Sequence, residues 1–397
     1  MFIMYCQGVI HMKPLAKRIS SVTGSAIRRM VGKSYGLDNV ISFAFGEPDF
    51  VTPQHIIQAG IKAMEEGRTF YTPNAGIPEL RDAIAASYGP RGMQYGRDNV
   101  IVTVGGCEAL LLSVLTLLDP GDEVIISNPY WANYNGFVSE MYAIPVLVDV
   151  YEKNDFMFDP ADIEKAITPR TKAILMNFPS NPTGGLATRE NLEAIARLAI
   201  QHDLYVITDE MYRRLIYTDE TFVSIAEIPG MKERTIIVDG FSKAYAMTGW
   251  RVGFAIANEE IIKGMTKMQE NAVSSVFEPV QRAALAALKG SQQPVADMLE
   301  HYRARRQLML EGLNTMMHGK ITCREPKGAF YMFPNITGTG LSSEEFSNRL
   351  LDEKHVVTVP GTGFGSNGEG FIRLSYATSE ANIREGLKRI QEFVEAL

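Results

Sequence analysis

Several features are scarce in this chain of 397 residues. Its three cysteines, Cys6, Cys107 and Cys323, are too few for a disulfide framework or a metal cluster, and they suit a reducing cytoplasm. No apolar run reaches the length of a membrane span. Basic residues do not predominate, and the formal net charge of −7 argues against a nucleic acid held by broad electrostatics. We therefore expect a cytoplasmic protein without a metal, nucleic-acid or membrane partner.

Repeats and low-complexity tracts are also absent, and no G-x-G-x-x-G pattern opens a βαβ unit, which disfavours a nicotinamide dehydrogenase. What is present is ordinary globular composition, 46% hydrophobic and 21% charged, with length enough for two domains.

Between residues 99 and 256, β-like runs alternate with helix-like runs. Most of the β-like runs are continuously apolar, as expected for parallel strands that are buried on both faces. The pattern predicts an α/β fold with an open, mostly parallel sheet. The seven candidate strands are Val100–Val104, Glu123–Ser127, Ile144–Val150, Lys172–Met176, Leu204–Thr208, Thr235–Asp239 and Val252–Ala257.

Beyond this region the chain becomes helical and charged, and short strands are predicted at Ala329–Phe333, His355–Val359 and Phe371–Ser375. This change indicates a second, smaller α+β domain. We predict an N-terminal extension or arm over residues 1–12, the N-terminal part of the small domain over 13–48, a large domain over 49–290, and the C-terminal part of the small domain over 291–397.

The most informative stretch runs from Gly240 to Gly253 and contains Lys243 and Arg251. Lys243 follows a predicted strand and has small neighbours. A lysine at the open end of a strand can lose solvent and act as an amine nucleophile. On this stretch alone, an ordinary surface lysine is an equal alternative.

Polar groups follow other predicted strands. Gly105, Gly106 and Cys107 open a helix whose free N–H groups suit an anion, although a tight packing turn explains the glycines as well. Asn181, before a proline, follows a predicted strand at the end where open α/β sheets bind ligands, and an ordinary turn is an equal alternative. Trp131 offers a flat aromatic face, with core packing as the alternative.

Three further residues are candidates for binding charged groups. Asp209 ends a predicted strand and needs a cationic partner if buried, with a helix N-cap as the competing reading. Tyr212 places a phenol three residues later. Arg373 lies in a β-like run, where its guanidinium suits a carboxylate, and an exposed arginine on an edge strand is the alternative.

From about Lys13 to the C-terminus these motifs resemble the class I aminotransferases, pyridoxal-phosphate enzymes of fold type I. The resemblance is strongest to the bacterial branch that includes aspartate, aromatic and alanine aminotransferases. It rests on the motifs Phe45–Phe50, Tyr71–Arg81, Asn181–Gly184 and the Lys243 stretch, in this order. It implies a large domain with a seven-stranded, mostly parallel sheet, a small α+β domain and a homodimer.

The resemblance also implies roles for residues at matching positions. Lys243 would bind the cofactor covalently and later carry a proton from the substrate Cα. Asp209 would keep the pyridine nitrogen protonated. Asn181 and Tyr212 would bond the ring 3-oxygen, and Trp131 would stack on the ring.

The remaining implied roles concern the phosphate and the substrate. The Gly105, Gly106 and Cys107 backbone would hold the phosphate together with Arg251 and Ser242, and a neighbouring subunit would add Tyr71. Arg373 would bind the substrate α-carboxylate, with Gly46, Asn181 and Trp131 nearby. The implied reaction passes an amino group to a 2-oxo acid such as 2-oxoglutarate in a pyridoxal/pyridoxamine phosphate ping-pong cycle.

Two departures from the family pattern stand out. Gly240 occupies a position where many relatives have a phosphate-binding serine, and Ser242 is the nearest substitute. Relatives specific for dicarboxylates place a basic residue against the distal carboxylate, but this chain has Cys107 at one such position and no Lys or Arg in 269–278. We therefore expect neutral or aromatic donors, with acidic substrates still open through Arg28 or Arg29.

Two alternatives use the same type of fold. A carbon–sulfur lyase would need the same lysine, so Lys243 does not distinguish it from an aminotransferase. The aminotransferase-like domain of a transcription regulator would follow a DNA-binding domain, and we expect the roughly 45 residues before Gly46 to be too few for one.

Overall fold

The computed structural model describes residues 13, 15–20, 24–219 and 221–397, and its centre is a seven-stranded sheet in the order β2-β8-β7-β6-β5-β3-β4. All neighbouring strands are parallel except those that pair with β8. The predicted α/β sheet is therefore confirmed. The strands are β2 (Val100–Thr103), β3 (Glu123–Asn128), β4 (Ile144–Asp149), β5 (Thr171–Asn177), β6 (Tyr205–Asp209), β7 (Thr235–Gly240) and β8 (Gly253–Ile256).

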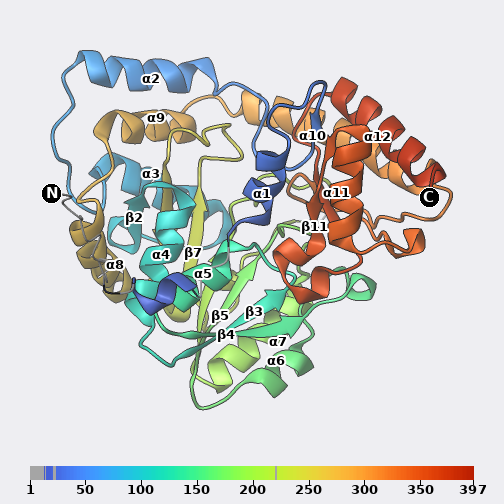
Figure 1. Ribbon diagram of the computed structural model, residues 1–397. Coiled ribbons are helices and arrows are strands. Elements are labelled where there is room, and N and C mark those ends of the chain that lie inside the picture. Colours follow the sequence, from blue (N-terminus) through green and yellow to red (C-terminus); the bar gives the residue numbers. More distant parts are fainter. Residues whose placement is uncertain (1–12, 14, 21–23, 220) are drawn as a thin grey trace, which may run out of the picture.

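Helices pack on both faces of the sheet, so successive residues of a strand enter different cores (Figure 1). On β5, Ile174 packs in the same core as Ile195 of α7, whereas Leu175 shares a core with Leu110 of α4. The helices around the sheet (Figure 1) include α4 (Gly105–Leu117), α5 (Asn133–Glu140), α6 (Pro160–Ala166), α7 (Arg189–Gln201) and α8 (Glu259–Ala272).

The strand β4 departs from the expectation that these strands are buried on both faces. It lies at the edge of the sheet, where Ile144 is 44% exposed and Leu147 is 41% exposed. The mostly apolar run therefore predicted a strand correctly but did not reveal that this strand pairs with only one other strand of the sheet.

A second, smaller set of strands lies beside the helices α10 (Gln293–Thr315), α11 (Ser343–Lys354) and α12 (Glu380–Glu395). An antiparallel sheet has the order β11-β12-β9, formed by Val359–Pro360, Ile372–Ser375 and Tyr331–Met332. The single strand predicted over 355–359 is divided, because β10 (Val356–Val357) instead pairs with β1 (Ile41–Ser42).

The N-terminal helix α1 (Ala26–Lys33) lies between the large sheet and the C-terminal helices (Figure 1). The helices α2 (Gln54–Glu65), α3 (Pro78–Tyr88) and α9 (Glu278–Lys289) gather at another end of the molecule. The domain boundaries stay a prediction, and the arm over 1–12 lies outside the described residues. Within the described ranges, no helix is long and apolar enough to cross a membrane.

Candidate active site

A cavity of about 340 Å³ lies where the parallel strands of the large sheet end. Asp209 is the last residue of β6, Asn181 follows β5, and Lys243 follows β7. Because the carboxyl ends of parallel strands meet at one edge, side chains that are far apart in the chain face the same space. This edge is the usual ligand site of an open α/β sheet.

The structure brings all but two of the predicted site residues to this cavity. One group lies at the ends of the two neighbouring strands β6 and β7 and in the segment before β8, and consists of Asp209, Tyr212, Ser242, Lys243 and Arg251. The other group consists of Gly46, Gly106, Cys107, Trp131, Asn181 and Arg373. The two exceptions are Gly105, which precedes the lining residue Gly106 in the chain, and Tyr71.

The amine of Lys243 donates a hydrogen bond to the backbone carbonyl of Gly46, with an Nζ–O distance of 2.6 Å. Burial lowers the pKa of this amine to about 8, although Cys107 and Glu47 act in the opposite direction. A substantial fraction of the amine is therefore neutral just above neutral pH. A neutral amine in a closed pocket is both a nucleophile and a base.

Asp209 is buried, and burial raises the pKa of its carboxyl group to about 6. Its Oδ1 accepts from the N–H of Met211 at 3.1 Å, and its Oδ2 accepts from the Tyr134 hydroxyl at 2.8 Å. The carboxyl group is ionised at neutral pH, and among the described residues Lys243 is the positive charge that lowers its pKa, without forming an ion pair with it. It can therefore receive a cation that a ligand brings.

The guanidinium of Arg373 is fixed on several sides. Its Nη1 donates to Asn181 Oδ1 at 2.9 Å, and its Nη2 donates to the carbonyl of Ala44. The rings of Tyr331 and Phe364 lie 4.5 and 4.8 Å from its central carbon. Its buried Nε has no hydrogen-bond partner in the described part of the chain, so donor capacity remains for a bound anion.

The start of α4 forms a narrow cradle next to Arg251. Gly105 has φ +76°, and a Cβ atom there would lie 2.6 Å from Arg251 Nη2. Glycine thus lets free backbone N–H groups and a guanidinium approach the same space, an arrangement that suits an anion. At Gly240, a Cβ atom would lie 3.0 Å from the Gly253 Cα, which leaves little room for a serine.

Two tyrosines at the cavity were not singled out from the sequence. Tyr134 holds Asp209, and the hydroxyl groups of Tyr331 and Tyr212 lie 2.9 Å apart. A Cβ atom at Gly46 would lie 1.9 Å from the Tyr331 hydroxyl, so glycine is needed there. Tyr134 had a sequence signal, because it lies three residues after Trp131, but nothing near Tyr331 in the chain indicated its contact.

Tyr71 does not reach the cavity of its own chain. It lies in the loop between α2 and α3 and is 90% exposed, beside Phe70, which is 82% exposed. Large aromatic side chains this exposed are typical of surfaces that another chain covers.

The fold and the cavity define an α/β enzyme with an amine, a carboxylate and a guanidinium converging on one site. Residues 38–390 match the protein family described as aminotransferase class I and II. The chain is 43% identical over 382 residues to the putative aminotransferase YugH of Bacillus subtilis, covering 96% of this chain and 98% of that protein. It is 40% identical to aromatic-amino-acid aminotransferase 2 of Thermococcus litoralis, covering 95% and 97%.

Among solved structures, an aspartate aminotransferase from Thermus thermophilus with maleate superposes with a TM-score of 0.91 at 39% identity, covering 97% of this chain and 100% of that one. The chain belongs to the class I and II aminotransferases. It is a transaminase of the pyridoxal-phosphate-dependent kind and transfers amino groups, and these relatives do not favour the lyase alternative.

Proposed function

We propose that this enzyme moves the amino group of a neutral or aromatic L-amino acid to a 2-oxo acid such as 2-oxoglutarate, in a ping-pong cycle on bound pyridoxal phosphate. One observation carries the proposal. The Lys243 amine, the Asp209 carboxylate and the Arg373 guanidinium line a single cavity of about 340 Å³. The reaction needs a base, a charge for the ring nitrogen and a clamp for the α-carboxylate, and these residues supply them.

The residues around the cavity fit pyridoxal phosphate. Glycine at position 105 brings the start of α4 and Arg251 together, which supports a phosphate held by this backbone, Arg251 and Ser242. Asp209, which forms no ion pair among the described residues and is only influenced by the charge of Lys243, suits a protonated ring nitrogen. Tyr212 and Asn181 offer donors for the ring oxygen, and Trp131 offers a face for the ring.

When bound, the cofactor supplies an electron sink for the pair of electrons that a departing Cα proton leaves behind. Lys243 would hold the cofactor through its aldehyde carbon, and once the substrate amine has displaced it, its free amine would take the proton from the substrate Cα. Its lowered pKa of about 8 gives it a neutral fraction for both tasks. Asp209 keeps a negative charge beside the ring nitrogen above a pH of about 6.

Arg373 orients the substrate by binding its α-carboxylate. The buried, unpartnered Nε and the ring contacts on both sides support this role, because a fixed guanidinium loses little freedom when the carboxylate arrives. The amide of Asn181, which already accepts from Arg373, lies at the same end of the cavity.

The walls of the cavity support apolar and aromatic donors. Ile27, Phe45 and Leu110 line it, and burial raises the pKa of the Cys107 thiol, which stays neutral. An unpaired carboxylate against these groups would be unfavourable. Arg28 of α1 also lines the cavity and supports acidic substrates, above all the acceptor 2-oxoglutarate.

The exposed ring of Tyr71 supports a homodimer in which this residue reaches the phosphate site of the other subunit. Val51, at 81% exposed, adds a further apolar residue to the surface of the monomer. Surfaces of this kind are buried in stable assemblies.

A donor panel tests the function. Each L-amino acid is offered with 2-oxoglutarate or pyruvate, and aromatic and neutral donors should give the highest kcat/KM. Without acceptor, an aminotransferase releases one equivalent of 2-oxo acid per site and then stops. Continued release of 2-oxo acid with ammonia would contradict transfer and restore the lyase.

A further inference from the structure

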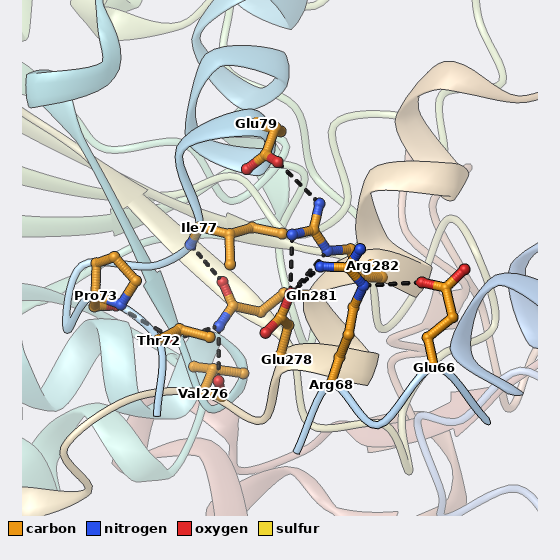
Figure 2. Close-up of polar contacts among 10 residues, drawn as sticks. All are labelled: Glu66, Arg68, Thr72, Pro73, Ile77, Glu79, Val276, Glu278, Gln281 and Arg282. Atoms are coloured by element: carbon orange, nitrogen blue, oxygen red, sulfur yellow. Dashed lines mark hydrogen bonds and ion pairs between the residues drawn. The ribbon is translucent and has the colours of Figure 1, made fainter. Parts of the chain in front are cut away.

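A buried glutamine connects two surface loops near Tyr71 (Figure 2). Gln281 of α9 is completely buried. Its Nε2 donates to Thr72 Oγ1 at 3.0 Å and to the carbonyl of Val276 at 2.6 Å, and its Oε1 accepts from the N–H of Ile77 at 2.8 Å. One side chain thus joins the α2–α3 loop to the α8–α9 loop.

The α2–α3 loop carries the exposed rings of Phe70 and Tyr71, and their own chain gives these rings little support. Their direction therefore depends on the backbone that follows them. That backbone fits closely: Gly76 has φ +105°, and a Cβ atom there would lie 3.1 Å from Gln281 Oε1 and 2.5 Å from Val102 Cγ2. The loss of a hydrogen bond at Gln281 would therefore change the orientation of the Phe70 and Tyr71 rings.

The neighbouring ion pairs are only partly buried, in contrast to the completely buried Gln281. Arg282 pairs with Glu79 at 3.0 Å and with Glu278 at 2.8 Å, and Arg68 pairs with Glu66 at 2.9 Å (Figure 2). Ion pairs that solvent reaches are screened by it, whereas a completely buried amide that loses its partners leaves several polar groups unsatisfied. The order of the loop therefore depends on Gln281 rather than on its neighbour Arg282.

We propose that Gln281 is a positioning residue, which holds the α2–α3 loop so that Tyr71 enters the cofactor-phosphate site of a second subunit. This rests on the proposed function, in which Tyr71 has that role. Without Gln281, the Thr72 hydroxyl, the Ile77 N–H and the Val276 carbonyl lose their shared partner. The loop then samples other conformations, and the contact from Tyr71 to the phosphate is weakened.

The test is a double-mutant cycle on the holoenzyme, with the rate of cofactor release as the readout. Gln281→Met and Tyr71→Phe should each raise the release rate about tenfold, whereas the double variant should release no faster than Tyr71→Phe alone. The control Arg282→Gln should stay within about twofold of wild type. Sedimentation confirms that each variant remains assembled, and thermal unfolding separates a general loss of stability from the specific coupling.

The outcomes separate the two proposals. If Tyr71→Phe leaves cofactor release unchanged, the role of Tyr71 in the proposed function fails. Suppose that Tyr71→Phe speeds cofactor release. The positioning role alone is then overturned if Gln281→Met does not change the release rate, or if the double variant releases the cofactor faster than Tyr71→Phe alone. Should Gln281→Met fail to fold, Thr72→Val takes its place in the cycle, because it removes one bond to Gln281 at nearly constant volume, and the same two results decide.

Discussion

Replacing Asp209 by asparagine should stabilise the cofactor-free protein at neutral pH while abolishing transfer. Burial raises the pKa of this carboxyl group from 3.8 to about 6, so the folded chain binds the proton more tightly than the unfolded chain. The contribution of Asp209 to stability therefore falls as the pH rises through this interval. The difference of about two pH units between the folded and unfolded pKa values means that the ionised Asp209 lowers the free energy of unfolding by ~3 kcal/mol at neutral pH.

Asparagine removes the charge and can keep both hydrogen bonds. Its amide oxygen can accept from the N–H of Met211, and its amide nitrogen can donate to the Tyr134 hydroxyl, which both donates and accepts. The variant therefore isolates the cost of the buried charge. In the holoenzyme the same substitution removes the partner of the ring nitrogen, so transfer is lost.

The assay is urea unfolding of cofactor-free wild type and variant between about pH 5 and about pH 8. The variant should be more stable by about 1 to 2 kcal/mol at the acidic end and by about 3 kcal/mol at the basic end. As a control, Asp352→Asn at an exposed position of α11 should follow the wild-type profile. A difference that does not vary with pH, or an Asp209→Asn variant less stable at the basic end, would refute the reasoning.

Three further predictions concern the same cavity. Lys243→Ala should remove the visible absorption of the bound cofactor and lower transfer by more than about 10⁴-fold; an unchanged band would contradict its role. Arg373→Ala should raise KM about 10- to 100-fold for every amino acid. If activity is lost with only one substrate, Arg373 binds the side chain of that substrate and not the α-carboxylate. Arg28→Gln should lower kcat/KM about three- to tenfold for glutamate and 2-oxoglutarate only, and Arg29→Gln, which breaks a surface pair with Glu344, should not. An equal loss for alanine or phenylalanine in Arg28→Gln would argue against a contact with the distal carboxylate.

Much of the large sheet could be predicted because burial on both faces leaves long apolar runs, and all seven strands were found. The direction and place of β8 could not, since strand pairing joins segments far apart in the chain: Val100 on β2 lies opposite Ile256 on β8. The small domain was harder still. Its strands are only two to four residues long, too short for a periodic pattern, and the break between β10 and β11 depends on two different partners.

In the candidate site, too, local sequence patterns could be predicted, whereas contacts between distant segments could not. Residues in distinctive local patterns, such as Lys243 and Asn181, were found, and the structure brings them to one cavity. Contacts between distant segments were not found. Tyr331 and Tyr212 are far apart in the chain, and their hydroxyl groups come into contact only in the folded structure. The Tyr331 hydroxyl also leaves no room for a side chain at Gly46. A sequence read without a structure does not connect these positions.

The strand ends around Asp209 also show why this carboxylate remains available to a ligand. Three buried carboxyl groups lie together there: Asp209, Glu210 and Asp239. Asp239 binds Arg213, and Glu210 faces Arg91 at 4.0 Å, with burial raising its pKa to about 7. Asp209 receives only neutral donors in the described part of the chain. Asp239 is thus paired, and Glu210 is close to Arg91 and partly protonated at neutral pH. The carboxylate without an ion pair faces the cavity, where a protonated ring nitrogen would lower the cost of its burial.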